Sequence, residues 1–172
     1  MKEIRGNLWD HLDIADAIVI TTNGFIKANG ECVMGRGCAR EATERFPNLS
    51  KDLGATLTVL GNHVFLQNYD GHRIITFPVK PKSMICNQTK TNIVNHMKNK
   101  FKAGSVVPGW ACTADLDLII NSAKELRSMV TTLGLKNVVM PRPGCGAGEL
   151  EWDTVKKSIE PILNDRFSII TY

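Results

Sequence analysis

The sequence lacks an apolar run long enough to span a membrane, and no N-terminal stretch resembles a signal peptide. Its cysteines are odd in number and lack CxxC spacing, which argues against a disulfide framework and a structural zinc site; they are Cys32, Cys38, Cys86, Cys112 and Cys145. The histidines show no metal-ligand spacing and are expected to be structural or solvated; they are His11, His63, His72 and His96. These absences predict a cytoplasmic protein with reduced thiols, no metal and no cofactor.

The composition is that of an ordinary globular protein. A length of 172 residues fits a single domain spanning residues 1–172, and 43% of the residues are hydrophobic and 22% charged. The formal net charge of +4 permits an anionic ligand. A nucleic-acid partner is not indicated, because the lysines are spread out and no basic patch is interleaved with aromatic residues.

The stretch Pro141–Trp152 is rich in glycine and follows Asn137–Met140, a short apolar run typical of a buried strand. Asp153 is predicted to be the N-cap of the helix that comes next. Glycines alternate over Gly144–Gly148, so successive backbone N–H groups can turn toward one point beside a helix N-terminus. This order of strand, loop and helix suits a phosphate or diphosphate, although a tight turn alone gives the same pattern.

A second unit of the same kind occurs earlier in the chain. Ala15–Thr21 is a nearly continuous apolar run, as expected of a strand covered on both faces. The glycine-rich stretch Asn29–Gly37 follows it, and Cys38–Phe46 is predicted to be a helix that Pro47 ends. Two such loops could hold one ligand from both sides.

The rest of the chain alternates between predicted strands and helices. Asp115–Leu133 is the clearest helix, because its apolar residues recur at i, i+3, i+4 and i+7. Residues 83–110 are polar and are predicted to form a lid-like excursion with one helix. The other predicted elements are strands at Ile4–Trp9, Gly61–Leu66, His72–Phe77 and Phe167–Tyr172, a helix at Leu49–Leu60 broken near Gly54, and a helix from Asp153 to about Leu163. This alternation predicts an α/β domain with a mostly parallel sheet, whose ligands bind at the carboxyl ends of the strands.

Several of these stretches together resemble the macro domain family, and the resemblance covers nearly the whole chain. The matching motifs are Gly6-Asn7-Leu8, Ala17–Asn23, Gly35-Arg36-Gly37 and Gly144–Gly148. Cys32–Gly37 and Met140–Trp152 are similar to the branch that contains the terminal ADP-ribose protein glycohydrolase. The resemblance implies a three-layer α/β/α fold with a central mixed, mostly parallel sheet and a cleft for ADP-ribose.

The resemblance also implies roles for individual residues. Asn7 and Leu8 would meet the adenine, and Tyr172 would close the adenine side. The distal ribose would lie beside Asn23 and the first loop, which supplies Met34, Gly35, Arg36 and Gly37. The diphosphate would be held by backbone N–H groups of the second loop, which supplies Gly144, Cys145, Gly146, Ala147, Gly148 and Glu149.

The chain departs from the family pattern at the base site and at the catalytic site. Asn7 stands where the family has an aspartate that reads the adenine. The catalytic lysine of the glycohydrolase matches Lys80, but its aspartate position is Gly148, and Glu149 is the nearest carboxylate. Lys80 can also be read as an ordinary lysine at a strand end, and Glu149 as a glutamate that complements a helix dipole. Lys80 and Glu149 are therefore candidate catalytic residues.

Two further side chains near the second loop have alternative readings. Cys145 could be a nucleophile, but a cysteine between glycines more often just fits a tight space. Arg142 could pair with a phosphate or with the nearby Glu149 or Glu151. Trp152 is expected to pack under the loop.

The sequence is compatible with three functions. The first is an ADP-ribose-binding macro domain that hydrolyses protein-linked ADP-ribose or ADP-ribose 1″-phosphate. The second is a non-catalytic module that reads ADP-ribose. The third is a nucleotide-binding or nucleic-acid-binding protein, which the weak net charge disfavours.

Overall fold

Strand β2 (Ala17–Asn23) lies inside the central sheet, which explains its nearly continuous apolar sequence. Its neighbours β7 (Val138–Pro141) and β4 (His72–Lys80) both run parallel to it. Alternate residues of β2 enter two different core clusters, Ala17 and Val19 on one face and Ile18 and Ile20 on the other. A strand covered on both faces buries apolar side chains at successive positions, as the sequence predicted.

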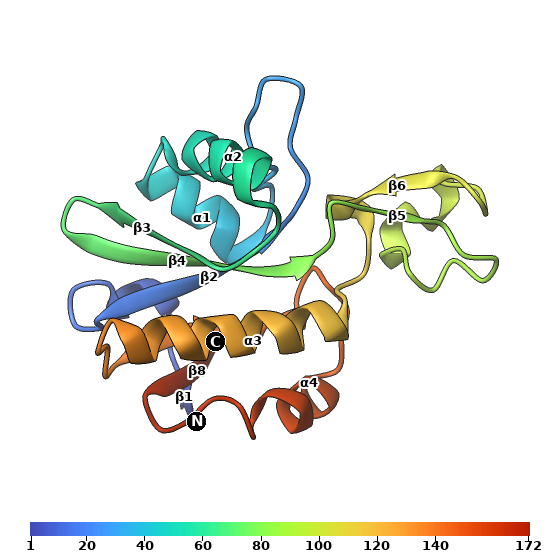
Figure 1. Ribbon diagram of the computed structural model, residues 1–172. Helices are drawn as coiled ribbons and strands as arrows, with labels where there is room; N and C mark the ends of the chain where they lie inside the picture. The colour runs from blue at the N-terminus through green and yellow to red at the C-terminus, as the bar shows by residue number, and fades with distance from the viewer.

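The computed structural model describes residues 1–172 and has three layers, with helices on both faces of a central sheet (Figure 1). The sheet has six strands in the order β1–β8–β7–β2–β4–β3, of which β3 alone pairs antiparallel to its neighbour. The strands not yet named are β1 (Lys2–Arg5), β3 (Phe65–Tyr69) and β8 (Phe167–Thr171). The predicted α/β/α fold with a mixed, mostly parallel sheet is confirmed.

Each face of the sheet is covered by a pair of helices. The helices α1 (Gly37–Arg45) and α2 (Leu49–Leu60) lie on one face, and α3 (Leu116–Thr132) and α4 (Trp152–Ile159) lie on the other (Figure 1). Asp115 is the N-cap of α3, and its carboxylate accepts a hydrogen bond from the backbone N–H of Leu118. None of the helices has both the length and the apolar composition needed to cross a bilayer.

The predicted bounds of several elements were wrong. The first strand ends at Arg5, because Asn7 caps the 3-10 turn η1 (Leu8–His11) and turns the chain. The first residue of α4 is Trp152, so Asp153 lies in the first turn and Glu151 is the N-cap. The same helix ends at Ile159 rather than near Leu163. Hydrophobic periodicity does not report where an element ends, and only the end at Asn7 is marked by a side-chain capping bond.

The predicted excursion forms a separate small unit, which we call the arm (residues 81–114). It contains the strand pair β5 (Ser83–Ile85) and β6 (Val106–Pro108) and the 3-10 turns η2 (Asn95–Lys100) and η3 (Gly109–Ala111). The expectation of one helix in a polar segment was wrong, because the arm has a core cluster of its own that includes Ile93, Val94, Met97 and Val107. It projects from the end of the sheet where β4 stops (Figure 1).

Helix α2 is continuous, so the predicted break near Gly54 was wrong. A Cβ atom at Gly54 would lie 1.9 Å from the carbonyl oxygen of Gly30 and 3.0 Å from the backbone nitrogen of Cys32. Glycine stands here because the segment before the first loop crosses the helix at this point. Its presence reflects a close backbone approach and does not mark a helix end.

We therefore predict that Gly54→Ala destabilises the protein. Alanine would favour the helix by about 1 kcal/mol. That gain is outweighed because the new Cβ would overlap the backbone at Gly30, and overpacking of this kind costs typically about 1–3 kcal/mol. The free energy of unfolding, measured in urea, should fall by about 1–2 kcal/mol.

The matched control is Gly35→Ala, since a Cβ at Gly35 would meet nothing within 4 Å. This variant should unfold at the same urea concentration as the unsubstituted protein. Equal midpoints for the Gly54 and Gly35 variants would contradict the close-approach explanation.

Candidate functional site

A cavity of about 730 Å³ opens at the edge of the sheet where the parallel strands end. Along that edge, the ends of β1 and β8 lie at one side and Lys80, the last residue of β4, lies at the other. Between them lie the ends of β7 and β2. The volume is typical of a small-molecule site, and the place is where open α/β sheets bind ligands.

The second loop (Pro141–Leu150) presents unpaired backbone donors to the cavity. Gly146, Ala147 and Gly148 line the cavity, and their N–H groups have no acceptor within the protein. The loop is anchored by hydrogen bonds from Leu150 N–H to the Gly144 carbonyl (3.0 Å) and from Ala114 N–H to the Gly148 carbonyl (2.9 Å). Successive free N–H groups in a fixed loop form an anion-binding concavity.

The first loop (Val33–Gly37) faces the second because β2 and β7 are neighbours in the sheet. Asn23, at the end of β2, holds this loop: its side-chain amide donates to the Val33 carbonyl (2.7 Å) and its amide oxygen accepts from Phe25 N–H (2.9 Å). Arg36 is the N-cap of α1 and makes no side-chain capping bond. The α1 N-terminus therefore adds positive potential at the cavity.

Lys80 is only 7% exposed and closes the cavity at the β4 end. Its Nζ donates to the carbonyl oxygens of Ala147 (2.8 Å) and Trp110 (3.3 Å) and has no carboxylate partner. Burial lowers the pKa of Lys80 from 10.5 to about 8. Lys80 is thus not an ordinary exposed strand-end lysine: it is a buried amine, and a substantial fraction is neutral near pH 8.

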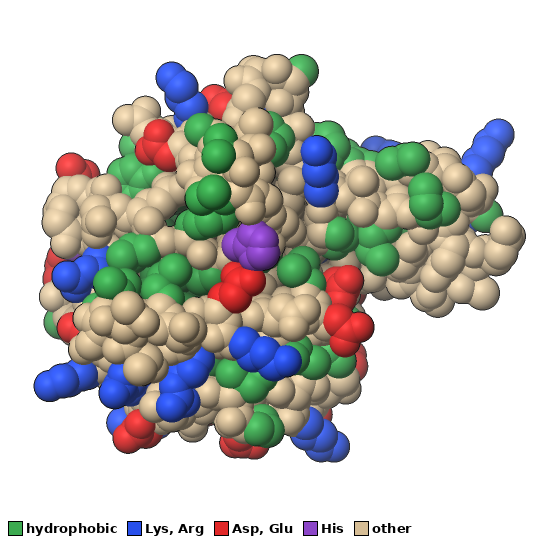
Figure 2. Space-filling view, in the orientation of Figure 1, with side chains coloured by type: hydrophobic (Ala, Val, Ile, Leu, Met, Phe, Trp, Pro, Cys, Tyr) green, Lys and Arg blue, Asp and Glu red, His purple; other side chains and the backbone are tan.

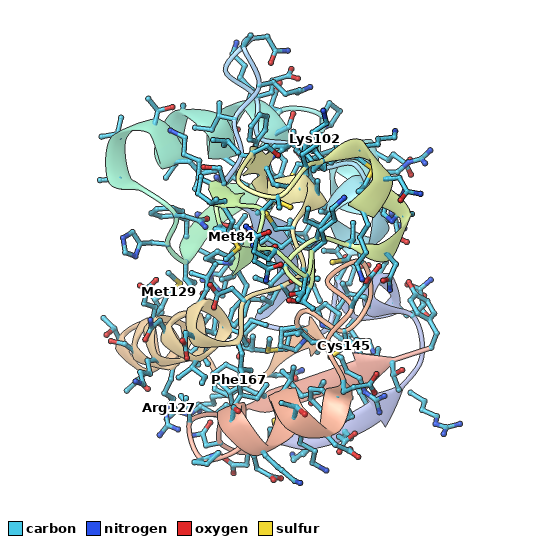
Figure 3. All side chains as sticks on the ribbon, turned by 90° about the vertical axis from the view of Figure 1, so that its right-hand side faces the viewer. Met84, Lys102, Arg127, Met129, Cys145 and Phe167 are labelled. Carbon is cyan, nitrogen blue, oxygen red and sulfur yellow. The ribbon has the colours of Figure 1, made fainter.

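The arm forms one wall of the cavity. His96, Met97 and Lys100 from η2 line the cavity, together with Trp110 from η3. The arm has no acidic residue between positions 81 and 114, and the face seen in Figure 2 accordingly shows basic side chains on it and no acidic ones. The second loop, marked by Cys145, lies beneath the arm residues Met84 and Lys102 when the molecule is viewed from the arm side (Figure 3).

Glu149 joins the second loop to the arm. Its carboxylate accepts from the backbone N–H of Asn95, at 2.9 Å to one oxygen and 3.1 Å to the other, at the start of η2. Its backbone has a positive φ of 61°, a conformation that a non-glycine residue adopts at some cost. The contact holds the arm over the cavity.

Solved structures share this architecture. No protein-family model matches the sequence, and no curated protein matches it. The macrodomain of Thermus aquaticus DarG superimposes with a TM-score of 0.70 at 19% identity, covering 99% of this chain and 97% of that one. The macrodomain of Mycobacterium tuberculosis DarG gives 0.69 at 18% identity, covering 99% and 97%. Thermosipho africanus DarTG in complex with ADP-ribose gives 0.67 at 16% identity, covering 98% of this chain and 41% of that one.

The chain has the macrodomain fold. The resemblance inferred from the sequence motifs is therefore confirmed at the level of the fold. The glycine-rich loops that come after β2 and after β7 line one cavity, as the two strand–loop–helix units predicted.

Most of the predicted site residues line the cavity. They are Leu8, Asn23, Gly35, Arg36, Gly37, Lys80, Gly144, Cys145, Gly146, Ala147, Gly148 and Tyr172. Three others do not line it: Asn7, Met34 and Glu149. Met34 is 8% exposed and belongs to the core cluster beneath α1 and α2, while Glu149 is bound to the arm.

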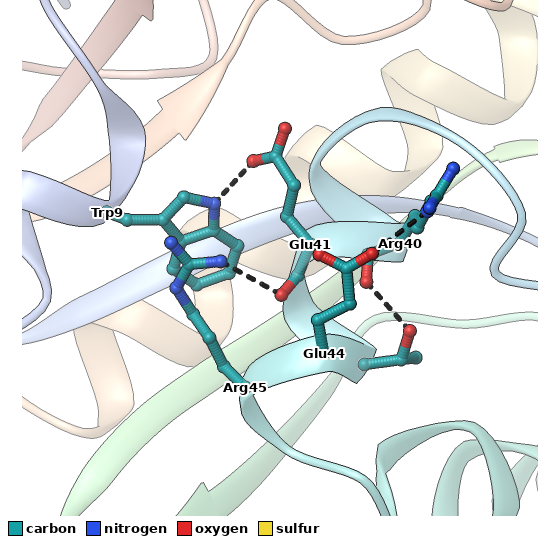
Figure 4. A network of polar contacts seen from close by, with 6 residues as sticks. Trp9, Arg40, Glu41, Glu44 and Arg45 are labelled. Atoms are coloured by element: carbon teal, nitrogen blue, oxygen red, sulfur yellow. Dashed lines mark hydrogen bonds and ion pairs between the residues drawn. The ribbon is translucent and has the colours of Figure 1, made fainter.

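The far end of the cavity, beside β1 and β8, is bounded by Leu8, Ile170 and Tyr172. Asn7 is exposed, and its side-chain oxygen accepts from the backbone N–H of Trp9 (2.9 Å), which caps η1. The carboxylate at this end belongs to Glu41 of α1, which accepts from the Trp9 indole N–H (Figure 4).

The second loop leaves no room for the family aspartate at Gly148. A Cβ there would lie 2.4 Å from the Gly144 carbonyl oxygen and 2.6 Å from the Ala114 Cβ. The φ of Gly148 is not in the left-handed region, so crowding alone requires the glycine. At Gly146, by contrast, a Cβ would meet nothing within 4 Å.

The structure bears on the alternative readings of Cys145 and of the Arg142 ion pair. Burial raises the pKa of the Cys145 thiol to about 11, so the thiol stays protonated and is a poor nucleophile. Arg142 pairs with Glu3 (3.2 Å) and lies over the Trp152 ring (5.0 Å), not with Glu149 or Glu151. Arg142 lines the cavity with its orientation fixed by these two contacts.

Several cavity residues were missed by sequence reasoning. His96, expected to be structural or solvated, lines the cavity with Lys100, because the arm folds back over the site. No local sequence pattern predicts that the arm lies against the cavity. Cys38 and Glu41 could have been found, since they follow the first loop at i and i+3 on one face of α1.

The buried Lys80 should make stability depend on pH in a predictable direction. Its pKa in the folded state, about 8, lies below the unfolded value of about 10.5, so the unfolded chain binds more protons between these pH values. The contribution of Lys80 to the free energy of unfolding therefore rises from about pH 8 to about pH 10.5. Below pH 8, burial of the charged amine lowers the free energy of unfolding by the full amount, about 3 kcal/mol. Lys80→Met should remove the penalty.

Urea unfolding at about pH 7.5 and about pH 9.5 tests this prediction. The stability gained by Lys80→Met relative to the unsubstituted protein should shrink at the higher pH. Lys82→Met is the control, because Lys82 is an exposed lysine two residues away. A gain that is the same at both pH values would contradict a lowered pKa for Lys80.

Proposed function

We propose that this protein binds ADP-ribose and hydrolyses an ADP-ribose derivative, either ADP-ribose linked to an acidic side chain or ADP-ribose 1″-phosphate. The strongest support for this proposal is the order of the features along the sheet edge. An apolar end (Leu8, Tyr172) is followed by the free N–H groups of the second loop, then by the first loop with Asn23, and then by Lys80. Adenine, diphosphate, distal ribose and reacting bond follow one another in the same order in the ligand.

The charge of the cavity supports an anionic ligand. Four basic side chains line it, Arg36, Lys80, Lys100 and Arg142, against one acidic side chain, that of Glu41. A diphosphate between the two glycine-rich loops would accept hydrogen bonds from the second loop and be attracted by the positive potential of the α1 N-terminus. The structural neighbour from Thermosipho africanus, described as a complex with ADP-ribose, adds support from a chain of the same fold.

Lys80 is the proposed catalytic residue. Its neutral amine would attack the anomeric carbon C1″ while the bond from C1″ to the carboxylate oxygen breaks, and the leaving carboxylate keeps the electron pair. Water then displaces the still protonated amine at C1″ and gives up one proton to solvent, which releases ADP-ribose and regenerates the neutral lysine. The lowered pKa supports this role because the nucleophile has to be neutral.

A non-catalytic ADP-ribose reader is the second candidate. It is favoured by the crowding at Gly148, which leaves no place for a carboxylate there, and by the engagement of Glu149 with Asn95. If Glu149 is to act as a general base, its bond to the arm has to open. Both candidates share the ADP-ribose site and differ only in turnover.

The binding prediction is that ADP-ribose gives a calorimetric titration with the folded protein and that AMP binds more weakly, because AMP does not span both loops. Gly146→Val should abolish binding, since a branched side chain would stand between the loop N–H groups and the diphosphate. Its melting temperature should change little because the position is open. Absence of heat with ADP-ribose for the folded, unsubstituted protein would overturn the proposed function.

The turnover prediction is that release of ADP-ribose from glutamate-linked substrate rises with pH through the Lys80 pKa of about 8. Both Lys80→Ala and Lys80→Arg should remove turnover while ADP-ribose still binds, because arginine keeps the charge but is never neutral. Lys82→Ala should behave as the unsubstituted protein does.

Activity on ADP-ribose 1″-phosphate distinguishes the alternatives. Phosphate release that survives Lys80→Ala would assign the chemistry to the loop N–H groups and a positioned water. If the protein binds ADP-ribose but turns over neither substrate, the result would support the non-catalytic binding module and contradict a catalytic role for Lys80.

A further inference from the structure

Glu41 has the one acidic side chain among the residues that line the cavity, and it lies toward the β8 end, away from Lys80. A single negative charge in an otherwise basic site for an anionic ligand is unfavourable unless it meets a hydrogen-bond donor. Glu41 is hydrogen-bonded to Trp9, which follows Leu8 in the chain, and its charge acts on Tyr172, so this donor would belong to the base end of the ligand.

The Glu41 carboxylate is held in place by a rigid neighbour. Its Oε2 accepts a hydrogen bond from the indole Nε1 of Trp9 (2.5 Å), and Trp9 is 8% exposed. The guanidinium of Arg45 covers the Trp9 ring at 4.3 Å, while Arg45 donates to the backbone carbonyl of Glu41 and makes no ion pair with the carboxylate. The second oxygen, Oε1, has no hydrogen-bond partner within the protein (Figure 4).

The side chains around Glu41 suit a flat aromatic ring. Leu8 and Ile170 line this end of the cavity with side chains that are almost fully buried, at 2% and 4% exposed, and Gly6, which also lines it, has no side chain. Tyr172 is 80% exposed and lies near enough to Glu41 that the carboxylate, after desolvation, contributes to raising the pKa of its phenol. A ring between these groups would present its polar edge to Oε1.

We infer that Glu41 is the residue that selects the base, by accepting a hydrogen bond from the 6-amino group of adenine through Oε1. This inference rests on the proposed function and assigns to α1 a role that the sequence motif assigns to Asn7. A carboxylate is only an acceptor, so it favours a purine with a donor at this edge and disfavours one without.

Asn7 is the competing candidate, and its placement is less suitable. Its side-chain oxygen already accepts from Trp9 N–H, its side chain is exposed, and it does not line the cavity. In this chain Asn7 positions Trp9 by capping η1, and Trp9 in turn positions Glu41. The two residues therefore act at the same end of the site in different ways.

The experiment compares ADP-ribose with the analogue in which hydrogen replaces the 6-amino group, titrated calorimetrically into three proteins. The unsubstituted protein should bind ADP-ribose about tenfold or more tightly than the analogue, the factor expected for one hydrogen bond to a charged acceptor. In Glu41→Gln the side-chain oxygen can still accept from Trp9, which leaves an NH₂ group facing the base. The preference for ADP-ribose should therefore vanish or reverse, while the analogue binds as before.

Glu44→Gln is the matched control, because Glu44 lies one turn further along α1 and pairs with Arg40 at the surface (Figure 4). It should keep the full preference. An undiminished preference in Glu41→Gln, or loss of the preference in Asn7→Ser instead, would overturn the inference while ADP-ribose binding still supported the proposed function. Absence of binding by the unsubstituted protein would overturn both.

Discussion

The parallel pairing of β2 with β7 on one side and β4 on the other is the constraint on which the site depends. Because the three strands run in the same direction, their carboxyl ends meet at one edge of the sheet. The second loop follows β7 directly, Asn23 at the end of β2 holds the first loop, and Lys80 is the last residue of β4. Residues separated by more than a hundred positions in the chain thereby bound one cavity.

Lys80 also connects three parts of the protein through one amine. Its hydrogen bonds to the Ala147 and Trp110 carbonyls join the end of β4 to the second loop and to the arm, and Glu149 adds a second link between loop and arm. Its hydrogen-bond acceptors are two carbonyl oxygens, and burial lowers its pKa although the charge of Glu149 acts in the opposite direction. The same contacts that fix the cavity wall therefore tune its candidate catalytic group.

The two ends of the cavity differ in chemistry because different layers supply them. At the Lys80 end the arm and both loops contribute basic side chains and free N–H groups, which suit phosphates and a reacting bond. At the opposite end α1, β8 and the turn after β1 contribute an apolar surface and the carboxylate of Glu41. Such polarity orients an elongated ligand in one direction, since only one end of the cavity suits its charged groups.

The sequence by itself determined the fold class and the loops. Continuous apolar runs at β2 and β7 required a sheet buried on both faces, and glycines placed directly after them required loops at the carboxyl ends. Those are local consequences of residue type, so they could be read from short stretches. The macro domain motifs added Lys80, whose buried setting the pattern alone did not reveal.

Only the tertiary structure decided which side chains meet in the cavity. Asn7 and Glu149 lie within the expected motifs, yet backbone N–H groups nearby occupy their side-chain oxygens, whereas His96 and Lys100 reach the site from the arm. The empty space beside Gly146 and the crowding at Gly148 likewise depend on what packs behind the loop. Side-chain hydrogen bonds and packing between distant segments set these outcomes, and no periodicity or motif spacing encodes them.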